Sequence, residues 1–294
     1  MKEPEIVVEP NPPREWVETV ERGLHHYNIA TIGLDEYRRV GVVSRDEHSA
    51  VIGGVLGNVV GGWLHVWSLW VDRRARGRGL ASDLMTAAEN YALSRQCVGA
   101  FLTTASYEAR PLYEKRGYRI FAELPEHPVK GHSRYWLAKD LRSAPSVTER
   151  RASRETIAME PYVSADTEAT IRRGIQTHAA GAIGRPEQSW SLANVFVRND
   201  DGEIVGGAMG NLWGDWLFIG ILWVDQPLRG NGQATRLMNA IERLAGEAGC
   251  RSAYLDTFNR RALSLYERLG YETFGVLENH PLGHAHHFLK KRLD

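Results

Sequence analysis

The chain has 294 residues, and its 36 Lys and Arg residues are matched by 36 Asp and Glu residues. This balance gives no global charge that would favour nucleic acid or an anionic membrane as a partner. The two cysteines, Cys97 and Cys250, are too few for a disulfide framework and indicate small core residues. Because we find no secretory signal and no apolar run that could span a bilayer, we expect a cytoplasmic protein.

The first part of the chain predicts a terminal segment, a helix and three strands. Residues 1–13 are rich in Glu and Pro and indicate a loose tail or an edge strand. Residues 14–27 place apolar side chains on one helical face. Apolar runs at 40–43 and 50–53 flank a polar turn, which is typical of a hairpin. The Trp-rich run at 63–71 is typical of a buried strand.

A glycine-containing turn and an amphipathic helix follow, and a further strand is predicted at 100–103. A short helix then carries Tyr113 and ends at Gly117, as glycine often does at a helix C-terminus. Strands at 118–123 and 135–138 complete this part of the chain.

The same order of elements recurs in the second half of the chain. The run Leu69-Trp-Val-Asp72 returns as Leu222-Trp-Val-Asp225, and Arg76-x-x-Gly79-x-Ala81 returns as Arg229-x-x-Gly232-x-Ala234, an offset of 153 (229 minus 76). Chance would not keep this register over most of a domain, so we infer a duplicated domain. We place the first domain at 1–143, a polar linker at 144–158 and the second domain at 159–294.

The glycine turn is the motif that points to a ligand. Glycine lets the backbone approach a ligand closely, and a helix N-terminus offers free N–H groups and a positive dipole to an anion. The run Arg73-Arg74-x-Arg76-x-Arg78 flanks the first turn and favours attraction of a phosphate over a merely solvated helix entrance. The pattern therefore indicates a pocket for a phosphate-bearing cofactor.

A helical tyrosine and then Gly-Tyr follow the arginine of the motif by 37 residues in each half (266 minus 229, and 113 minus 76). This order resembles the Gcn5-related N-acetyltransferases and covers nearly all of both halves. The resemblance implies an α/β (α+β) fold of two domains, each a mixed, mostly antiparallel sheet flanked by helices. It also implies a V-shaped splay between the middle strands of each sheet, in which acetyl-CoA (coenzyme A) binds.

The resemblance implies that backbone N–H groups of the turn hold the pyrophosphate, that the strand before it pairs with the pantetheine arm, and that an asparagine contacts the cofactor. In the second half these cofactor-binding positions are Leu222, Trp223, Val224, Arg229, Gly230, Asn231, Gly232, Gln233, Ala234 and Asn259. In the first half they are Leu69, Trp70, Val71, Arg76, Gly77, Arg78, Gly79, Leu80, Ala81 and Ser106.

The resemblance makes Tyr266, and Tyr113 in the first half, the general acid that protonates the departing thiolate. A core aromatic with its hydroxyl at the surface is the alternative for both. The first half departs from the pattern, because Ser106 replaces the asparagine and Pro111 removes a backbone donor from the short helix. We therefore predict that the second half is catalytic, and that the first is either degenerate or still binds cofactor or retains activity.

The general base is not identified, because neither 63–71 nor 216–224 contains a glutamate. His65 in the first half, Asp215 and Asp256 in the second, and a water chain to solvent are the candidates.

We predict that His280, His284, Trp216 and Asp215 line the amine pocket. Surface-loop histidines, a turn aspartate and a packed tryptophan are the alternatives. The histidine spacing fits no familiar zinc pattern, so no metal is expected.

The sequence thus predicts an acetyl-CoA-dependent N-acetyltransferase in which the amine of a small molecule attacks the thioester directly. The alternatives are a protein or peptide N-acetyltransferase and a non-catalytic acyl-CoA-binding protein. We expect a monomer whose halves form a pseudo-dimer, or a homodimer.

Overall fold

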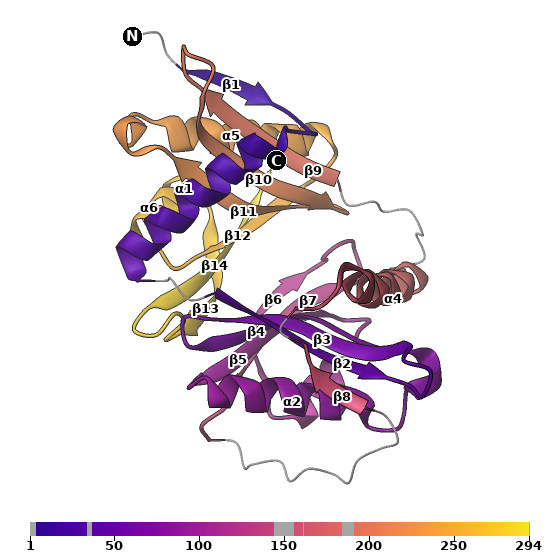
Figure 1. The fold of residues 1–294 in the computed structure, drawn as a ribbon. Helices are drawn as coiled ribbons and strands as arrows, with labels where there is room; N and C mark the ends of the chain where they lie inside the picture. The colour runs from indigo at the N-terminus through magenta and orange to yellow at the C-terminus, as the bar shows by residue number, and fades with distance from the viewer. Residues whose placement is uncertain (1–3, 34–36, 144–155, 161, 184–190, 294) are drawn as a thin grey trace.

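The computed structural model describes residues 4–33, 37–143, 156–160, 162–183 and 191–293, which form two seven-stranded sheets with flanking helices (Figure 1). The first sheet has the order β6-β7-β5-β4-β3-β2-β8, with β2 Tyr37–Arg45, β3 Val51–Val60, β4 Trp63–Val71, β5 Gly99–Ala105, β6 Arg119–Pro125, β7 Ser133–Asp140 and β8 Thr156–Met159. The second has the order β1-β9-β10-β11-β12-β14-β13, with β1 Glu5–Val8, β9 Ser191–Arg198, β10 Ile204–Trp213, β11 Trp216–Val224, β12 Ser252–Thr257, β13 Glu272–Glu278 and β14 Ala285–Arg292. The helices are α1 Arg14–Ile32, α2 Leu80–Ser94, α3 Arg110–Lys115, α4 Ala165–Ile183, α5 Gln233–Glu247 and α6 Arg260–Arg268.

The two repeats exchange their first strand and helix. β1 pairs with β9 of the second sheet, and α1 packs on β10 and β11. In return β8 pairs with β2 of the first sheet, and α4 packs on β3 and β4 (Figure 1). The division at residues 143 and 159 follows the repeat in the sequence, but each sheet takes an edge strand and a helix from the other repeat.

This exchange refines two expectations from the sequence. The N-terminal edge strand and helix are present, but they complete the sheet of the second half. Of the expected linker, residues 144–155 lie outside the described part of the chain, and residues 156–158 belong to β8.

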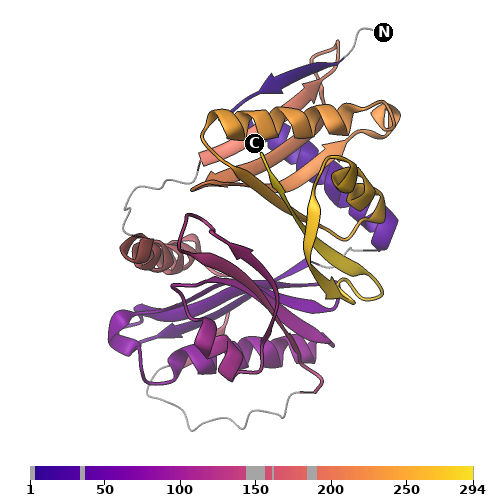
Figure 2. The ribbon, with the colours of Figure 1, turned by 180° about the vertical axis from the view of Figure 1, so that it is seen from behind.

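Each exchanged helix fits its new sheet through a glycine. Val20 of α1 is fully buried, and one turn later Gly23 lies directly against the indole of Trp223. A Cβ at Gly23 would overlap that ring, so only glycine lets the helix approach so closely. Gly174 of α4 has the same relation to Trp70. Figure 2 shows α5 in front of the second sheet and α1 behind it, so both faces are covered.

Both sheets open between their middle strands. Among the strands that the structure describes, all pairs are antiparallel except β4–β5 and β11–β12. In these two pairs, β4 is paired only over 63–66 and β11 only over 216–219. A register shift in the β10 pairing leaves Gly220 as an extra residue in β11, and Trp67 is the extra residue in β4. An extra residue bends a strand, so β11 leaves β12 from this point on. The predicted splay is confirmed.

The two halves meet through an aromatic cluster, which we call the junction. Trp63, Phe101, Ala122, Leu124 and Trp136 come from the first half, and Trp216, Tyr254, Leu277 and Phe288 from the second. The hairpin loop of each half reaches across: the Trp63 indole donates to the carbonyl of Asn279 (2.6 Å), and the Trp216 indole donates to that of Glu126 (2.8 Å).

Candidate functional site

The opening between β11 and β12 exposes strand backbone. Leu222, Trp223 and Val224 pair with β10 on one side, and on the other side they have no strand partner among the described residues. Leu69, Trp70 and Val71 have the same position in the first half. Unpaired N–H and C=O groups at such an edge can accept an extended ligand as an added strand.

In each half the glycine turn lies between the splayed end of the strand and the helix that follows it. Gly230 and Gly232 have φ of 82° and 80°, and Gly232 is the residue before the first turn of α5. No atom lies within 4 Å of a Cβ built on either glycine, so the space in front of the turn is open. Arg229 holds the turn in place by donating from Nε to the carbonyl of Val224 (2.8 Å). Asn231, Gln233 and Ala234 complete the turn and the helix start.

The first-half turn has the same construction. Arg76 donates from Nε to the carbonyl of Val71 (3.0 Å), and Gly77 and Gly79 have φ of 78° and 93°. Arg78, Leu80 and Ala81 complete it. Free N–H groups and the helix dipole make both turns suitable for an anion.

Tyr266 lies beneath the second opening. It projects from α6 into the same buried cluster as Ile219 and Leu255, which are the last paired residues of β11 and β12. Burial, with a smaller contribution from the charge of Asp256, raises its pKa above the ordinary value of 10. The hydroxyl therefore stays protonated at neutral pH. Tyr113 on α3 has the same place in the first half, and burial raises its pKa as well.

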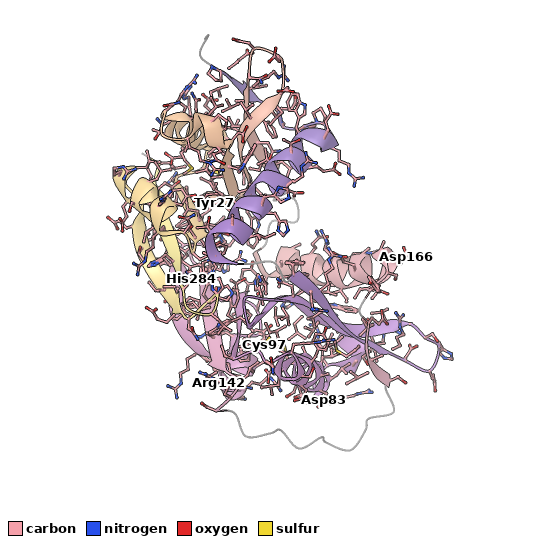
Figure 3. All side chains as sticks on the ribbon, turned by 60° about the vertical axis from the view of Figure 1, so that its left-hand side comes forward. Tyr27, Asp83, Cys97, Arg142, Asp166 and His284 are labelled. Carbon is pink, nitrogen blue, oxygen red and sulfur yellow. The ribbon has the colours of Figure 1, made fainter. Side chains whose placement is uncertain are left out.

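Asn259 marks the largest contrast between the two openings. Its side-chain oxygen caps α6 by accepting from the N–H groups of Arg261 and Ala262, and its amide donates to the Tyr27 hydroxyl (2.9 Å). The guanidinium of Arg229 lies 4.5 Å from the centre of the Tyr27 ring. Tyr27 belongs to α1, so the exchanged helix joins the turn to the start of α6 (Figure 3).

Ser106 has the corresponding place in the first half. Its hydroxyl accepts from the N–H of Ser133 (3.2 Å) and lies 3.5 Å from Nδ1 of His132. The serine therefore ties the end of β5 to the start of β7, and no residue from α4 bonds to it within the described residues.

The residues predicted to line the amine pocket are at the junction. His280 is buried, and its ring contacts those of Trp63 and Phe101 from the other half. Trp216 and Asp215 contact the hairpin of the first half, since the N–H of Asp215 donates to the carbonyl of Pro128 (2.9 Å). Figure 3 shows His284 at the tip of the β13–β14 hairpin, beside the first half. Their contact with an acceptor stays a prediction.

Sequence reasoning missed Tyr27 and His286. His286 bonds to Asp256 and to His280 inside the second half. The histidine-rich run was a visible signal for His286, whereas nothing in the sequence placed Tyr27 beside the second half.

No helix in the described ranges is long and apolar enough to cross a membrane.

Comparisons with known proteins show which family the chain is similar to. The model of a family described as "Acetyltransferase (GNAT) family" matches residues 8–118 and 159–271. An acetyltransferase of Agrobacterium fabrum is 34% identical over 134 residues, 46% of this chain and 96% of that protein. A blasticidin-S acetyltransferase of Streptomyces morookaense is 40% identical over 96 residues, 32% of this chain and 70% of that protein.

Among solved structures, an acetyltransferase from Bacillus cereus is 32% identical, with a TM-score of 0.42. The match covers 45% of this chain and 94% of that one.

Proposed function

Because the chain belongs to the acetyltransferase (GNAT) family, we propose that it transfers the acetyl group of acetyl-CoA to an amine of a small molecule at the second-half site. This site consists of the β11–β12 opening, the 229–234 turn, Tyr266, Asn259 and Tyr27. Acetyl-CoA is the acetyl donor of the family. The observation that carries the proposal is the position of Tyr266 beneath an opening whose mouth is a glycine turn.

The residues fit this cofactor. The splayed part of β11 offers backbone groups along one edge, and the open turn before α5 suits a pyrophosphate. Tyr27 joins Asn259, at the start of α6, to Arg229 of the turn. When bound, acetyl-CoA supplies the acetyl group and a thiol that can leave. Tyr266 holds a proton at its hydroxyl oxygen for that leaving group.

A small-molecule acceptor is supported by one relative, whose name gives blasticidin S as its substrate and which is 40% identical over 96 residues. The junction also supports it, because the hairpin of each half is fixed against the other half.

The test is an acceptor screen with the full chain. Purified protein receives acetyl-CoA with blasticidin S, spermidine or a lysine-containing peptide, and thiol release and the mass of the acetylated product are followed. Turnover of a small amine supports the proposal. Turnover of the peptide alone selects a protein acetyltransferase, and binding of acetyl-CoA without any turnover selects a non-catalytic binding protein.

A further inference from the structure

A carboxylate and two imidazoles form a continuous chain beside the second opening. Oδ2 of Asp256 lies 2.7 Å from Nε2 of His286, and Nδ1 of His286 lies 3.0 Å from Nδ1 of His280. The His286 side chain is 7% exposed, whereas that of Asp256 is 36% exposed. The carboxylate is thus the end of the chain that a ligand can reach.

Asp256 is positioned by the splay itself. It follows Leu255, the last residue of β12 that pairs with β11, so it is the first residue of β12 in the opening. Side chains alternate along a strand: Leu255 joins the cluster that contains Tyr266, and Tyr254 joins the junction. Asp256 therefore faces away from the helix layer that carries Tyr266. The Tyr266 hydroxyl and the Asp256 carboxylate therefore lie on opposite faces of the sheet at the β11–β12 opening.

The hydrogen bonds define which atom is free to act. Burial, helped by the neighbouring His286 and His65, lowers the pKa of His280 to about 2, so this ring is neutral. A carboxylate can only accept, so Nε2 of His286 donates to Asp256. When the His286 ring is neutral, its Nδ1 has no proton and accepts from Nδ1 of His280. This arrangement fixes the Oδ2 oxygen of Asp256 and leaves Oδ1 for a ligand.

We propose that Asp256 accepts the proton of the attacking amine at the second-half site and that His286 is a positioning residue for it. The inference rests on the proposed function. An ammonium loses two protons when it becomes an amide, while a C–N bond forms and the C–S bond breaks. The thiol takes up one proton, through Tyr266, and Asp256 takes the other and passes it to solvent.

Within the described part of the first half, no proton acceptor stands at the place equivalent to Asp256. Thr103 and Arg134 stand at the positions of Asp256 and His286, and Arg134 donates to the Thr103 hydroxyl (2.9 Å). A guanidinium stays protonated and a threonine hydroxyl is a poor base. The position after the paired part of the strand therefore holds a proton acceptor, Asp256, in the second half and none, Thr103, in the first.

The first half instead supports the carboxylate chain of the second. The loop that carries His280 is fixed at two points, since Trp63 donates to Asn279 and the N–H of Leu282 donates to the carbonyl of Gly61 (3.0 Å). Phe101 packs against His280 with ring centres 4.7 Å apart. The titratable groups that interact with the charge of Asp256 are His286 on β14, His65 on β4, Tyr254 on β12 and, across the sheet, Tyr266 on α6; Arg134 on β7 acts on His65 and Tyr254.

The test compares Asp256→Asn with wild type in the full chain, using the amine found by the acceptor screen. We expect kcat to fall roughly 10²-fold or more, because a positioned base contributes ~10²–10⁴-fold, with the Kd for acetyl-CoA unchanged. The residual rate should rise about tenfold per pH unit as the free amine forms in solution, and Asp256→Glu should recover part of kcat. Asp140→Asn, at the far end of β7, is the control and should keep the wild-type rate.

A second readout does not depend on turnover. The ¹⁵N NMR spectrum of the imidazole nitrogens of His286 should show a proton on Nε2, the atom that donates to Asp256.

Three results would overturn the proposal: a wild-type kcat and pH profile in Asp256→Asn, a loss of activity explained by lost acetyl-CoA binding, or a proton on Nδ1 of His286 alone. A fourth result, no turnover of any amine by the wild-type chain, would overturn both this proposal and the proposed function. The three results above leave the proposed function standing.

Discussion

The two halves agree in the contacts that hold the fold and differ in those that face the opening. In each, a buried glutamate on the long helix bonds to a lysine of the last strand and to a tyrosine hydroxyl. These contacts are Glu89 with Lys139 (2.7 Å) and Tyr118 (3.1 Å), and Glu242 with Lys291 (2.6 Å) and Tyr271 (2.9 Å). The tryptophan bonds across the junction are likewise made twice.

At the opening the second half has Asn259, bonded to Tyr27, where the first has Ser106. From this comparison we infer that the first half supports the second-half site. It supplies α1 to the second sheet and fixes the His280 loop, so the second-half site could not form from residues 159–294 alone.

The largest stability effect should come from the junction, where the halves are alike. Burial lowers the pKa of His127 well below its ordinary value, and that of His280 to about 2. The unfolded chain binds protons at these sites below pH ~6.5, while the folded chain does not. The unfolding free energy should therefore fall from pH 7 to pH 5, by about 2 kcal/mol for each histidine.

Denaturant unfolding at both pH values measures this. His127→Phe and His280→Phe should each remove about 2 kcal/mol of the loss, and His65, whose pKa burial lowers to about 4, should account for a similar remaining part. A pH dependence equal to wild type in both variants would contradict neutral burial.

A smaller effect tests the exchange of helices. Gly23→Ala would push a methyl group into the Trp223 ring, and overpacking of this kind costs about 1–3 kcal/mol. Although Gly23 belongs to the first repeat, the variant should impair acetyl transfer at the second-half site. Gly174→Ala, which meets Trp70, should lose similar stability with a smaller effect on transfer. Thermal unfolding and kcat/KM are measured for both variants. A larger loss of kcat/KM in Gly174→Ala than in Gly23→Ala would argue against the exchange.

The smallest expected effect concerns Tyr27. Tyr27→Phe keeps the ring under Arg229 and removes the acceptor of the Asn259 amide. A hydrogen bond of this kind contributes about 0.5–1.5 kcal/mol, so the Kd for acetyl-CoA should rise roughly 2- to 10-fold by calorimetry.

Val20 and Gly23 correspond to Ile171 and Gly174, an offset of 151 (171 minus 20), so His178 is the counterpart of Tyr27. It is exposed, and His178→Phe is the matched control. An equal shift in both variants would contradict a role for Tyr27.

The sequence predicted most of the elements and the glycine turns, because these depend on local periodicity and on positive-φ glycines, whereas the splay was predicted only through the family resemblance. It did not predict the exchange. The two repeats present equivalent sheet faces, so α1 can satisfy its apolar pattern on either sheet, and nothing local distinguishes Phe196 as the partner of Val20. His286 was hidden for a similar reason. Its partner Asp256 is 30 residues away (286 minus 256), and only the β12–β14 pairing brings them together.

The central claim is that acetyl transfer takes place in the second half alone. Tyr266→Phe and Tyr113→Phe, which remove one hydroxyl each from equivalent buried positions, test it most directly. With the acceptor from the screen, kcat should fall ~10²–10⁴-fold in Tyr266→Phe, about 3–5 kcal/mol in the barrier. Tyr113→Phe should keep nearly the wild-type kcat. Equal losses in the two variants, or a loss in Tyr113→Phe alone, would contradict the claim.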